Sequence, residues 1–246
     1  MHSKAIAVIL LLLLSYSVQA QPDTLLLKPG NTIIDGTIIK PYTNKWKVTY
    51  FDAQGKAVPN KVWTDYGQII ELDDKQYFHR VQDLYDPKMN LLVTWINMVE
   101  LNTLLPVSFS TLSPSGGFSY YQFDGNHIIG SANNQSKERE IISIDKTLAE
   151  SVYDWNMYGM LLIGLPLKEH LIAKLPYAST PSGELKWLVA HVTGKDQLSV
   201  PNNKTITTWK VETNQNLTFW LSKKAPYVIK LEAYLPNNTK MVWEMI

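Results

Sequence analysis

Residues 45–56 read Lys-Trp-Lys-Val-Thr-Tyr-Phe-Asp-Ala-Gln-Gly-Lys. Polar and apolar side chains alternate over the first part of this stretch, which places Trp46, Val48 and Tyr50 on one face of a strand. Asp52 to Lys56 then has the composition of a turn, because Asp and Gly accept the backbone angles of tight turns. An alternating strand that ends in a short polar turn is typical of antiparallel sheets. The stretch therefore predicts β-structure with one buried face.

Similar stretches recur along the chain, separated by turn signals such as Asp73-Asp74 and the hairpin signal Asp124-Gly125. In the stretch 217–221, Phe219 faces one way and Trp220 the other, so both faces of that strand need a neighbour. We predict a mainly β protein, built as a curved antiparallel sheet or a half-open β-barrel. The further strands are expected at residues 63–72, 76–81, 91–99, 107–112, 118–123, 127–131, 140–144, 185–193, 205–213, 217–221, 227–235 and 240–246.

One segment differs from this pattern. Residues 148–162 are rich in Tyr, Trp and Met with few β-branched residues, so part of the segment is expected to be a helix packed against the sheet. Gly164-Leu165-Pro166-Leu167 should end it, because proline disfavours helix in the residue before it. The following residues 168–175 fit either a short helix or a strand. Residues 21–246 are expected to form a single β-rich domain, with a candidate seam at 113–117.

Residues 1–20 predict a cleavable export signal. Lys4 is followed by an apolar run from Ala5 to Leu14 that is too short to span a bilayer, and Val18-Gln19-Ala20 fits a small-residue cleavage site. The remaining residues hold 22 basic and 22 acidic side chains, so no net charge draws the chain to nucleic acid or to an anionic membrane. We expect a soluble periplasmic or extracellular protein that has no membrane span.

The chain contains no cysteine. This excludes disulfides, thiol nucleophiles and cysteine metal sites. It also predicts that the protein is not a bacterial lipoprotein, since the lipid of that class is attached to a cysteine at the cleavage site. Stability must then come from the core, for which 8 Trp, 13 Tyr and 6 Phe supply large apolar areas.

Several segments of the C-terminal half carry a resemblance to a known family. They are Tyr120-Tyr-Gln-Phe-Asp-Gly125, Leu162-Ile-Gly-Leu-Pro-Leu167, Val192-Thr-Gly-Lys-Asp196, Thr208-Trp-Lys-Val211 and residues 219–231. In order and spacing, roughly residues 105–246 resemble the exported bacterial family known as domain of unknown function 3108 and its relatives. The resemblance implies a curved, mainly antiparallel sheet, similar in style to the half-barrels that carry lipids or lipoproteins across the periplasm. Because fold does not fix function, that link to carriers is an analogy.

No pattern in the sequence predicts catalysis, a metal or a cofactor. His79, His127, His170 and His191 show no metal-binding spacing. Ser143 and Lys146 fit a Ser-x-x-Lys spacing, but they follow a strand-like stretch, whereas that chemistry needs the start of a helix. The acidic pairs Asp73-Asp74 and Asp83/Asp86 sit in expected turns, where aspartate is common for local reasons. We therefore expect no catalytic residue, no metal and no cofactor.

The abundance of aromatic residues is the feature that indicates a function, since aromatic side chains on a concave sheet can bind lipid tails or stack on sugars. Our first hypothesis is a non-enzymatic binding protein for an apolar or amphipathic ligand, such as a lipid or a cell-envelope component. The residues expected to line its site are Trp155, Tyr158, Trp209, Phe219 and Trp220. The alternative is a module that binds a protein of the bacterial envelope. A third hypothesis, a hydrolase, would need a carboxylate pair or a Ser–His contact assembled from distant strands.

Overall fold

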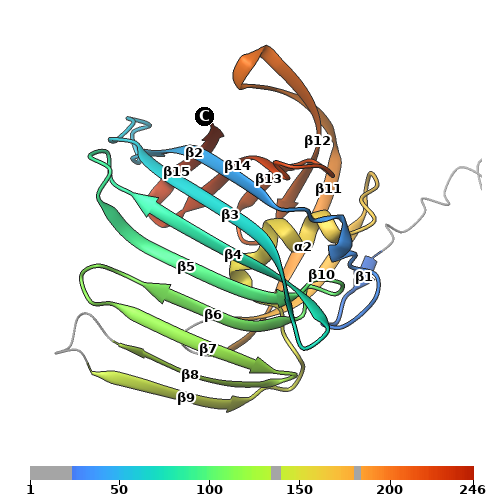
Figure 1. Cartoon of the computed structure of the whole chain (residues 1–246). Helices are drawn as coiled ribbons and strands as arrows, with labels where there is room; N and C mark the ends of the chain where they lie inside the picture. The colour runs from blue at the N-terminus through green and yellow to red at the C-terminus, as the bar shows by residue number, and fades with distance from the viewer. Residues whose placement is uncertain (1–23, 134–139, 180–183) are drawn as a thin grey trace, which may run out of the picture.

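The structure is a computed structural model that describes residues 24–133, 140–179 and 184–246. The expected export signal at residues 1–20 lies outside these ranges. Fifteen strands in the described ranges form one sheet, with the order β1-β10-β11-β12-β13-β14-β15-β2-β3-β4-β5-β6-β7-β8-β9 (Figure 1). The strands are β1 (Thr24–Leu26), β2 (Tyr42–Phe51), β3 (Lys61–Leu72), β4 (Lys75–Tyr85), β5 (Leu91–Glu100), β6 (Pro106–Leu112), β7 (Phe118–Asp124), β8 (His127–Asn133), β9 (Ile141–Thr147), β10 (Ile172–Ser179), β11 (Glu184–Val200), β12 (Lys204–Thr213), β13 (Leu217–Leu221), β14 (Val228–Leu235) and β15 (Thr239–Met245).

The prediction of a mainly β fold is confirmed. The sheet is open, with β1 and β9 at its two ends, and it curves around a concave face. Strand β1 pairs with β10 in parallel. The other neighbouring strands in this order pair in antiparallel fashion. Residues 168–175 fitted either a short helix or a strand. In the structure, Ile172 to Leu175 form the start of strand β10.

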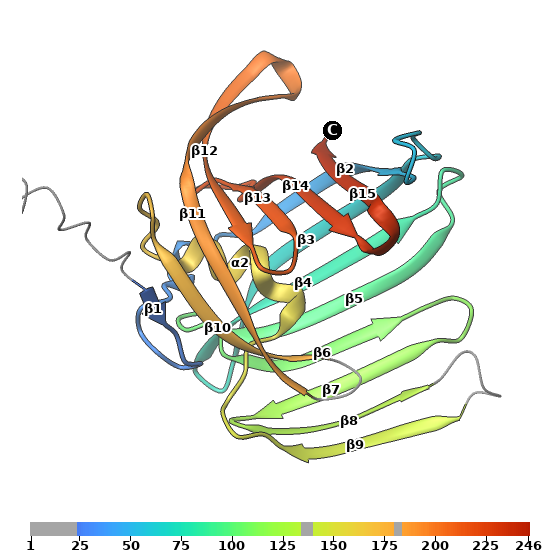
Figure 2. The same cartoon turned by 180° about the vertical axis from the view of Figure 1, so that it is seen from behind.

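Two details of the sheet follow from local backbone requirements. Asp73 and Asp74 both adopt positive φ, 50° and 61°, which is the conformation of the two-residue hairpin turn predicted between β3 and β4. Strand β11 runs to Val200, well past the expected end at residue 193. The pairing of β11 with β12 shifts register between Val192 and Gly194, and Gly194 has a φ of 146°, so a bulge at this glycine lets the hairpin continue. Figures 1 and 2 show the long β11–β12 hairpin extending beyond the rest of the sheet.

A short helix fills the curve of the sheet. The 3-10 turn η2 (Trp155–Met157) leads into α2 (Tyr158–Gly164), so the helix begins later than residue 148 and ends at Gly164, as the following proline predicts. Just before it, Asp154 is extended and Tyr153 forms an isolated bridge with Tyr177. The remaining 3-10 turns are η1 (Gly36–Ile38), η3 (Pro201–Asn203) and η4 (Pro236–Asn238). No helix in the described ranges combines the length and the apolar character needed to cross a membrane.

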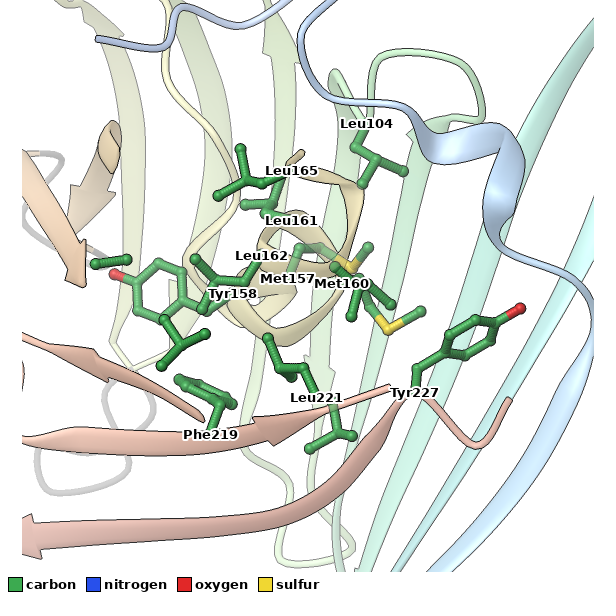
Figure 3. Close-up of a cluster of buried hydrophobic side chains, with 14 of the residues drawn as sticks. Leu104, Met157, Tyr158, Met160, Leu161, Leu162, Leu165, Phe219, Leu221 and Tyr227 are labelled. Carbon is green, nitrogen blue, oxygen red and sulfur yellow. The ribbon is translucent and has the colours of Figure 1, made fainter. Parts of the chain in front are cut away.

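Packing, rather than helix propensity, holds α2 in place. All seven of its residues are buried, and a helix this short is not stable in water by itself. Figure 3 shows its apolar side chains facing Phe219 and Leu221 of β13, with Tyr227 alongside. A Cβ atom at Gly159 would lie 2.8 Å from Val228 Cγ2, so the glycine allows the helix to approach β14 closely.

The C-terminal end of α2 is held by a lysine from the loop between β13 and β14. Lys223 Nζ donates to the carbonyl oxygen of Ile163 at 2.5 Å and also to that of Leu165. These carbonyls lie at the helix end, where backbone acceptors have no intrahelical partner and where the helix dipole favours a cation. Lys223 therefore fixes the helix against the sheet.

We predict that Lys223→Met lowers the free energy of unfolding by about 1–2 kcal/mol, because two backbone acceptors lose their charged donor. Urea unfolding followed by tryptophan fluorescence measures the change. The neighbouring exposed residue provides a matched control, since Lys224→Met should change stability by less than about 0.5 kcal/mol. Equal losses in the two variants would contradict a role for Lys223 at the helix end.

Candidate functional site

A cavity of about 230 Å³ lies between α2 and the concave face of the sheet. Its walls come from η2, α2 and strands β2–β5 and β13–β15, so segments far apart in the sequence meet there. Most of its lining is apolar, with polar side chains in one group. The lining residues are Trp46, Trp63, Arg80, Gln82, Trp95, Trp155, Asn156, Tyr158, Gly159, Leu217, Phe219, Val228, Leu231, Met241 and Trp243.

Four tryptophans form one side of this cavity. The rings of Trp63 and Trp95 stack at 4.6 Å between centroids with an interplanar angle of 8°. Trp243 lies 4.2 Å from Trp63 and 5.8 Å from Trp46. These four residues, here called the tryptophan wall, stand on strands β15, β2, β3 and β5, so the stacked rings of Trp63 and Trp95 meet across the intervening strand β4. Aromatic rings packed against one another have little freedom, so the wall is a rigid apolar surface.

The opposite side is built around the helix. Trp155, Tyr158 and Gly159 come from η2 and α2, and Phe219 comes from β13. Phe219 is 5% exposed and Tyr158 8%, whereas Trp155 is 37% exposed. Trp155 is thus the ring on this side that is most open to solvent.

A group of polar residues, here called the polar cluster, forms one part of the lining and extends behind it. It consists of Asp65, Arg80, Gln82, Asn97, Asp154 and Asn156. Its members are buried except for Asn156, which is half-buried. Arg80 Nη2 lies 2.6 Å from Asp65 Oδ2, and Arg80 Nε donates to the same carboxylate at 3.0 Å and 3.1 Å. Arg80 Nη1 donates to the carbonyl oxygen of Asn156 at 2.9 Å. The guanidinium therefore connects β3 and β4 to the turn that begins the helix.

Asparagine side chains extend this network to a second carboxylate. Asn156 Nδ2 donates to Asn97 Oδ1 at 2.9 Å, and Asn97 Nδ2 donates to Asp154 Oδ2 at 2.5 Å. Asp154 also caps η2 by accepting from the backbone N–H of Asn156. Burial raises the pKa of Asp154 to about 6, although these hydrogen bonds and the charge of Arg80 favour its ionised form. At neutral pH the cluster thus holds two carboxylates and one guanidinium.

Three of the five residues predicted to line a site meet in the cavity, namely Trp155, Tyr158 and Phe219. Trp220 lies on the other face of β13, where its Nε1 donates to Asp196 Oδ2 at 3.0 Å and Lys230 Nζ sits 4.6 Å from its ring. Trp209 packs against the main hydrophobic cluster but does not line the cavity. Whether these residues bind a ligand stays a prediction.

Sequence reasoning missed the tryptophan wall and the polar residues of the lining. Alternation placed Trp46 on a buried face, and it is fully buried, but the pattern gave no sign that this face borders a cavity. Arg80, Gln82 and Asn156 carried no motif at all. The one available signal was a set of polar residues at inward positions of otherwise apolar strands, which needs the strand register to be known.

The candidate catalytic patterns lie elsewhere in the described chain. The residues that line the cavity include none of His79, His127, His170 and His191. Ser143 and Lys146 belong to strand β9, not to the start of a helix. His127 Nε2 lies 2.6 Å from Asp145 Oδ1 at the surface. Within the described ranges, no three His, Asp or Glu side chains gather as metal ligands would.

A family model described as "Protein of unknown function (DUF3108)" matches residues 70–242. The chain belongs to this family. The DUF3108 match contains every segment that carried the resemblance. It begins at residue 70 instead of about 105, so it also takes in strands β4 and β5, and it ends at residue 242. Most of the strands that line the cavity lie within the DUF3108 region.

A search of curated proteins found no significant match. A solved structure described as "a putative lipoprotein from Parabacteroides distasonis ATCC 8503" matches at a TM-score of 0.36 and 12% identity, over 85% of this chain and 98% of that chain. A likeness at that TM-score carries no argument about this DUF3108 protein.

We predict that Arg80→Met lowers the free energy of unfolding by about 3–5 kcal/mol, because it leaves the buried Asp65 carboxylate without its partner. Urea denaturation provides the measurement. The exposed pair Lys210–Glu212 serves as the control, and Lys210→Met should cost less than about 1 kcal/mol. A loss below about 1 kcal/mol for Arg80→Met would show that the pair is not a structural requirement.

We also predict a pH-dependent effect of Asp154→Asn. The native pKa of about 6 lies above the ordinary value of 3.8, so between these pH values the native state binds more protons than the unfolded state. The protonated Asp154 therefore makes the native state about 3 kcal/mol more stable below about pH 4 than at neutral pH. This contribution is lost as the pH rises through about 6. Asp154→Asn should accordingly gain stability relative to the unmodified protein across this window.

Urea unfolding at about pH 4 and about pH 7 tests this difference. Asp86 provides a control, because hydrogen bonds from Asn90 lower its pKa below the ordinary value of 3.8, so the group is largely ionised in both states over this window. The stability difference between the Asp86→Asn variant and the unmodified protein should thus change little between these two pH values. A pH-independent difference for Asp154→Asn would refute the assignment.

Proposed function

We propose that the cavity binds the apolar part of an amphipathic ligand, such as a lipid or another cell-envelope component, and that the chain is a non-enzymatic binding protein. The observation that carries this proposal is the cavity of about 230 Å³ walled by tryptophans and other apolar side chains. Small-molecule sites are typically concave and mostly apolar, with a few polar groups that fix orientation. The tryptophan wall and the polar cluster correspond to these two parts.

The size of the cavity limits what it holds. An apolar cavity of about 150 Å³ accepts benzene, while sites for drug-sized ligands span about 300–1,000 Å³. A cavity between these values suits a bicyclic ring or a segment of an acyl chain. The rest of such a ligand would lie outside the cavity.

The rigidity of the site supports binding without rearrangement. The tryptophan rings pack on one another, and α2 is fixed by Lys223 at one end and by Arg80, through Asn156, at the start of η2. A preformed site avoids the entropic cost of ordering side chains when a ligand binds. The expected export signal at residues 1–20 would bring this site outside the cytoplasm, where envelope lipids are available.

A second candidate function is a module that binds an envelope protein. On the face of β6–β9 opposite Tyr121, the side chains of Leu112, Tyr120, Ile129 and Ile141 are 50%, 43%, 47% and 63% exposed. Exposed apolar groups that gather on one face are typical of docking surfaces. Binding through this face would be unaffected by changes inside the cavity, which separates the two functions experimentally.

We predict that the uncharged fluorescent probe N-phenyl-1-naphthylamine binds saturably and that Leu217→Phe weakens it by about tenfold or more, because the larger ring occupies the cavity. Thr218→Phe is the matched control, since adjacent residues of a strand point to opposite faces. Native mass spectrometry of the freshly purified protein, followed by solvent extraction, should in addition detect a copurified lipid. Equal probe affinity in both variants, or no binding at all, would refute the cavity as the site.

A further inference from the structure

We infer that the cavity accepts an uncharged group and rejects an anionic one, so its ligand enters as a neutral chain or ring and not as a free carboxylate, sulfonate or phosphate. The inference rests on the proposed function, because it describes the chemistry of the same site. It follows from three properties of the lining: the hydrogen bonds of Arg80, the charge balance of the polar cluster, and the aromatic wall.

Arg80 is the one cationic side chain among the described residues that line the cavity, and each of its three guanidinium nitrogens already donates to a protein acceptor. Its Nε and Nη2 donate to Asp65, and its Nη1 donates to the backbone of Asn156. Its side chain is 5% exposed and that of Asp65 1%. A ligand anion could replace Asp65 as the main partner of the guanidinium only by breaking this buried pair, and it would then leave Asp65 unpaired.

The charge balance behind the lining also opposes an anion. Asp65 neutralises Arg80, and Asp154 is a second buried carboxylate in the same network. Asn156, which lines the cavity, donates to Asn97, and Asn97 in turn donates to Asp154. With both carboxylates ionised, the polar cluster has a net charge of −1. An anion placed beside it would meet repulsion in a poorly solvated site.

The rest of the lining offers an anion neutral donors but no second cation. Trp243 Nε1 is a buried donor that has no hydrogen-bond partner among the described residues, and a neutral acceptor can use it as well as an anion can. The faces of aromatic rings carry negative potential, and four of the lining side chains belong to the tryptophan wall. Removing an ion from water without a partner is far more costly than removing a neutral group. A neutral acyl chain or aromatic ring loses no such hydration and still gains the apolar contact.

The restriction applies to the group that enters the cavity and not to the part of the ligand that stays in water. A free fatty acid can therefore enter only tail first, with its carboxylate outside. An acyl chain esterified to a larger molecule, or an uncharged ring, can fill the whole cavity beside Gln82 and Asn156.

The test compares two probes that share one ring system. N-phenyl-1-naphthylamine is uncharged, and 1-anilinonaphthalene-8-sulfonate is the same skeleton with one sulfonate. Fluorescence titration at about pH 7.5 should show at least about tenfold weaker binding of the sulfonate. The cavity-filled Leu217→Phe variant is the blank, so that only emission lost in that variant counts as binding in the cavity.

Asp154→Asn provides a second measurement, since it removes one negative charge without changing the shape of the side chain. We expect this variant to bind the sulfonate about twofold to fivefold more tightly and the neutral probe as before. Equal or tighter cavity binding of the sulfonate by the unmodified protein would overturn the inference and leave the proposed function standing. If neither probe binds in the cavity, the proposed function itself fails, and the inference fails with it.

Discussion

The concave face of an open, curved sheet must be covered, because its inward side chains are apolar and the two end strands β1 and β9 stand at opposite ends of the strand order. The chain meets this constraint with one short segment, η2 and α2. Seven helical residues cover a limited area, and they are stable only because Leu161, Leu162 and Ile163 are fully buried against the sheet. The cavity lies beside this helix, where part of the concave face remains uncovered.

The polar cluster shows how the position of the helix is specified. Apolar packing alone is non-directional, whereas the hydrogen bond from Arg80 to the Asn156 carbonyl and the cap made by Asp154 fix where η2 begins. Buried charges carry a desolvation cost, which is visible in the raised pKa of Asp154. Sites that depart from an all-apolar core are often functional. The same residues that position the helix also set the charge beside the cavity, so the proposed ligand preference depends on Arg80 as the position of the helix does.

The sequence pattern predicted the orientation of some aromatic residues but not their neighbours. Alternation at residues 217–221 correctly placed Phe219 and Trp220 on opposite faces, but it did not tell which of them borders the cavity. Trp155 and Tyr158 were found because they lie in the one segment without strand composition. Trp63, Trp95 and Trp243 were not found, since their proximity depends on the order β15-β2-β3-β4-β5, in which the last strand of the chain pairs with the second. No local sequence pattern indicates that β15 pairs with β2.

By itself, the sequence determined most of the strands, though not β1 or the choice of strand for β10. It also determined the turns at Asp73-Asp74 and Asp124-Gly125, the end of the helix before Pro166, and membership in DUF3108. These depend on interactions between residues close in the chain, or on motifs that can be read directly. Tertiary structure alone decided which faces meet, where the tryptophan wall forms and that Arg80 is paired with Asp65. The physical reason is that burial and pairing depend on strand register and sheet curvature, which arise from contacts across the whole chain.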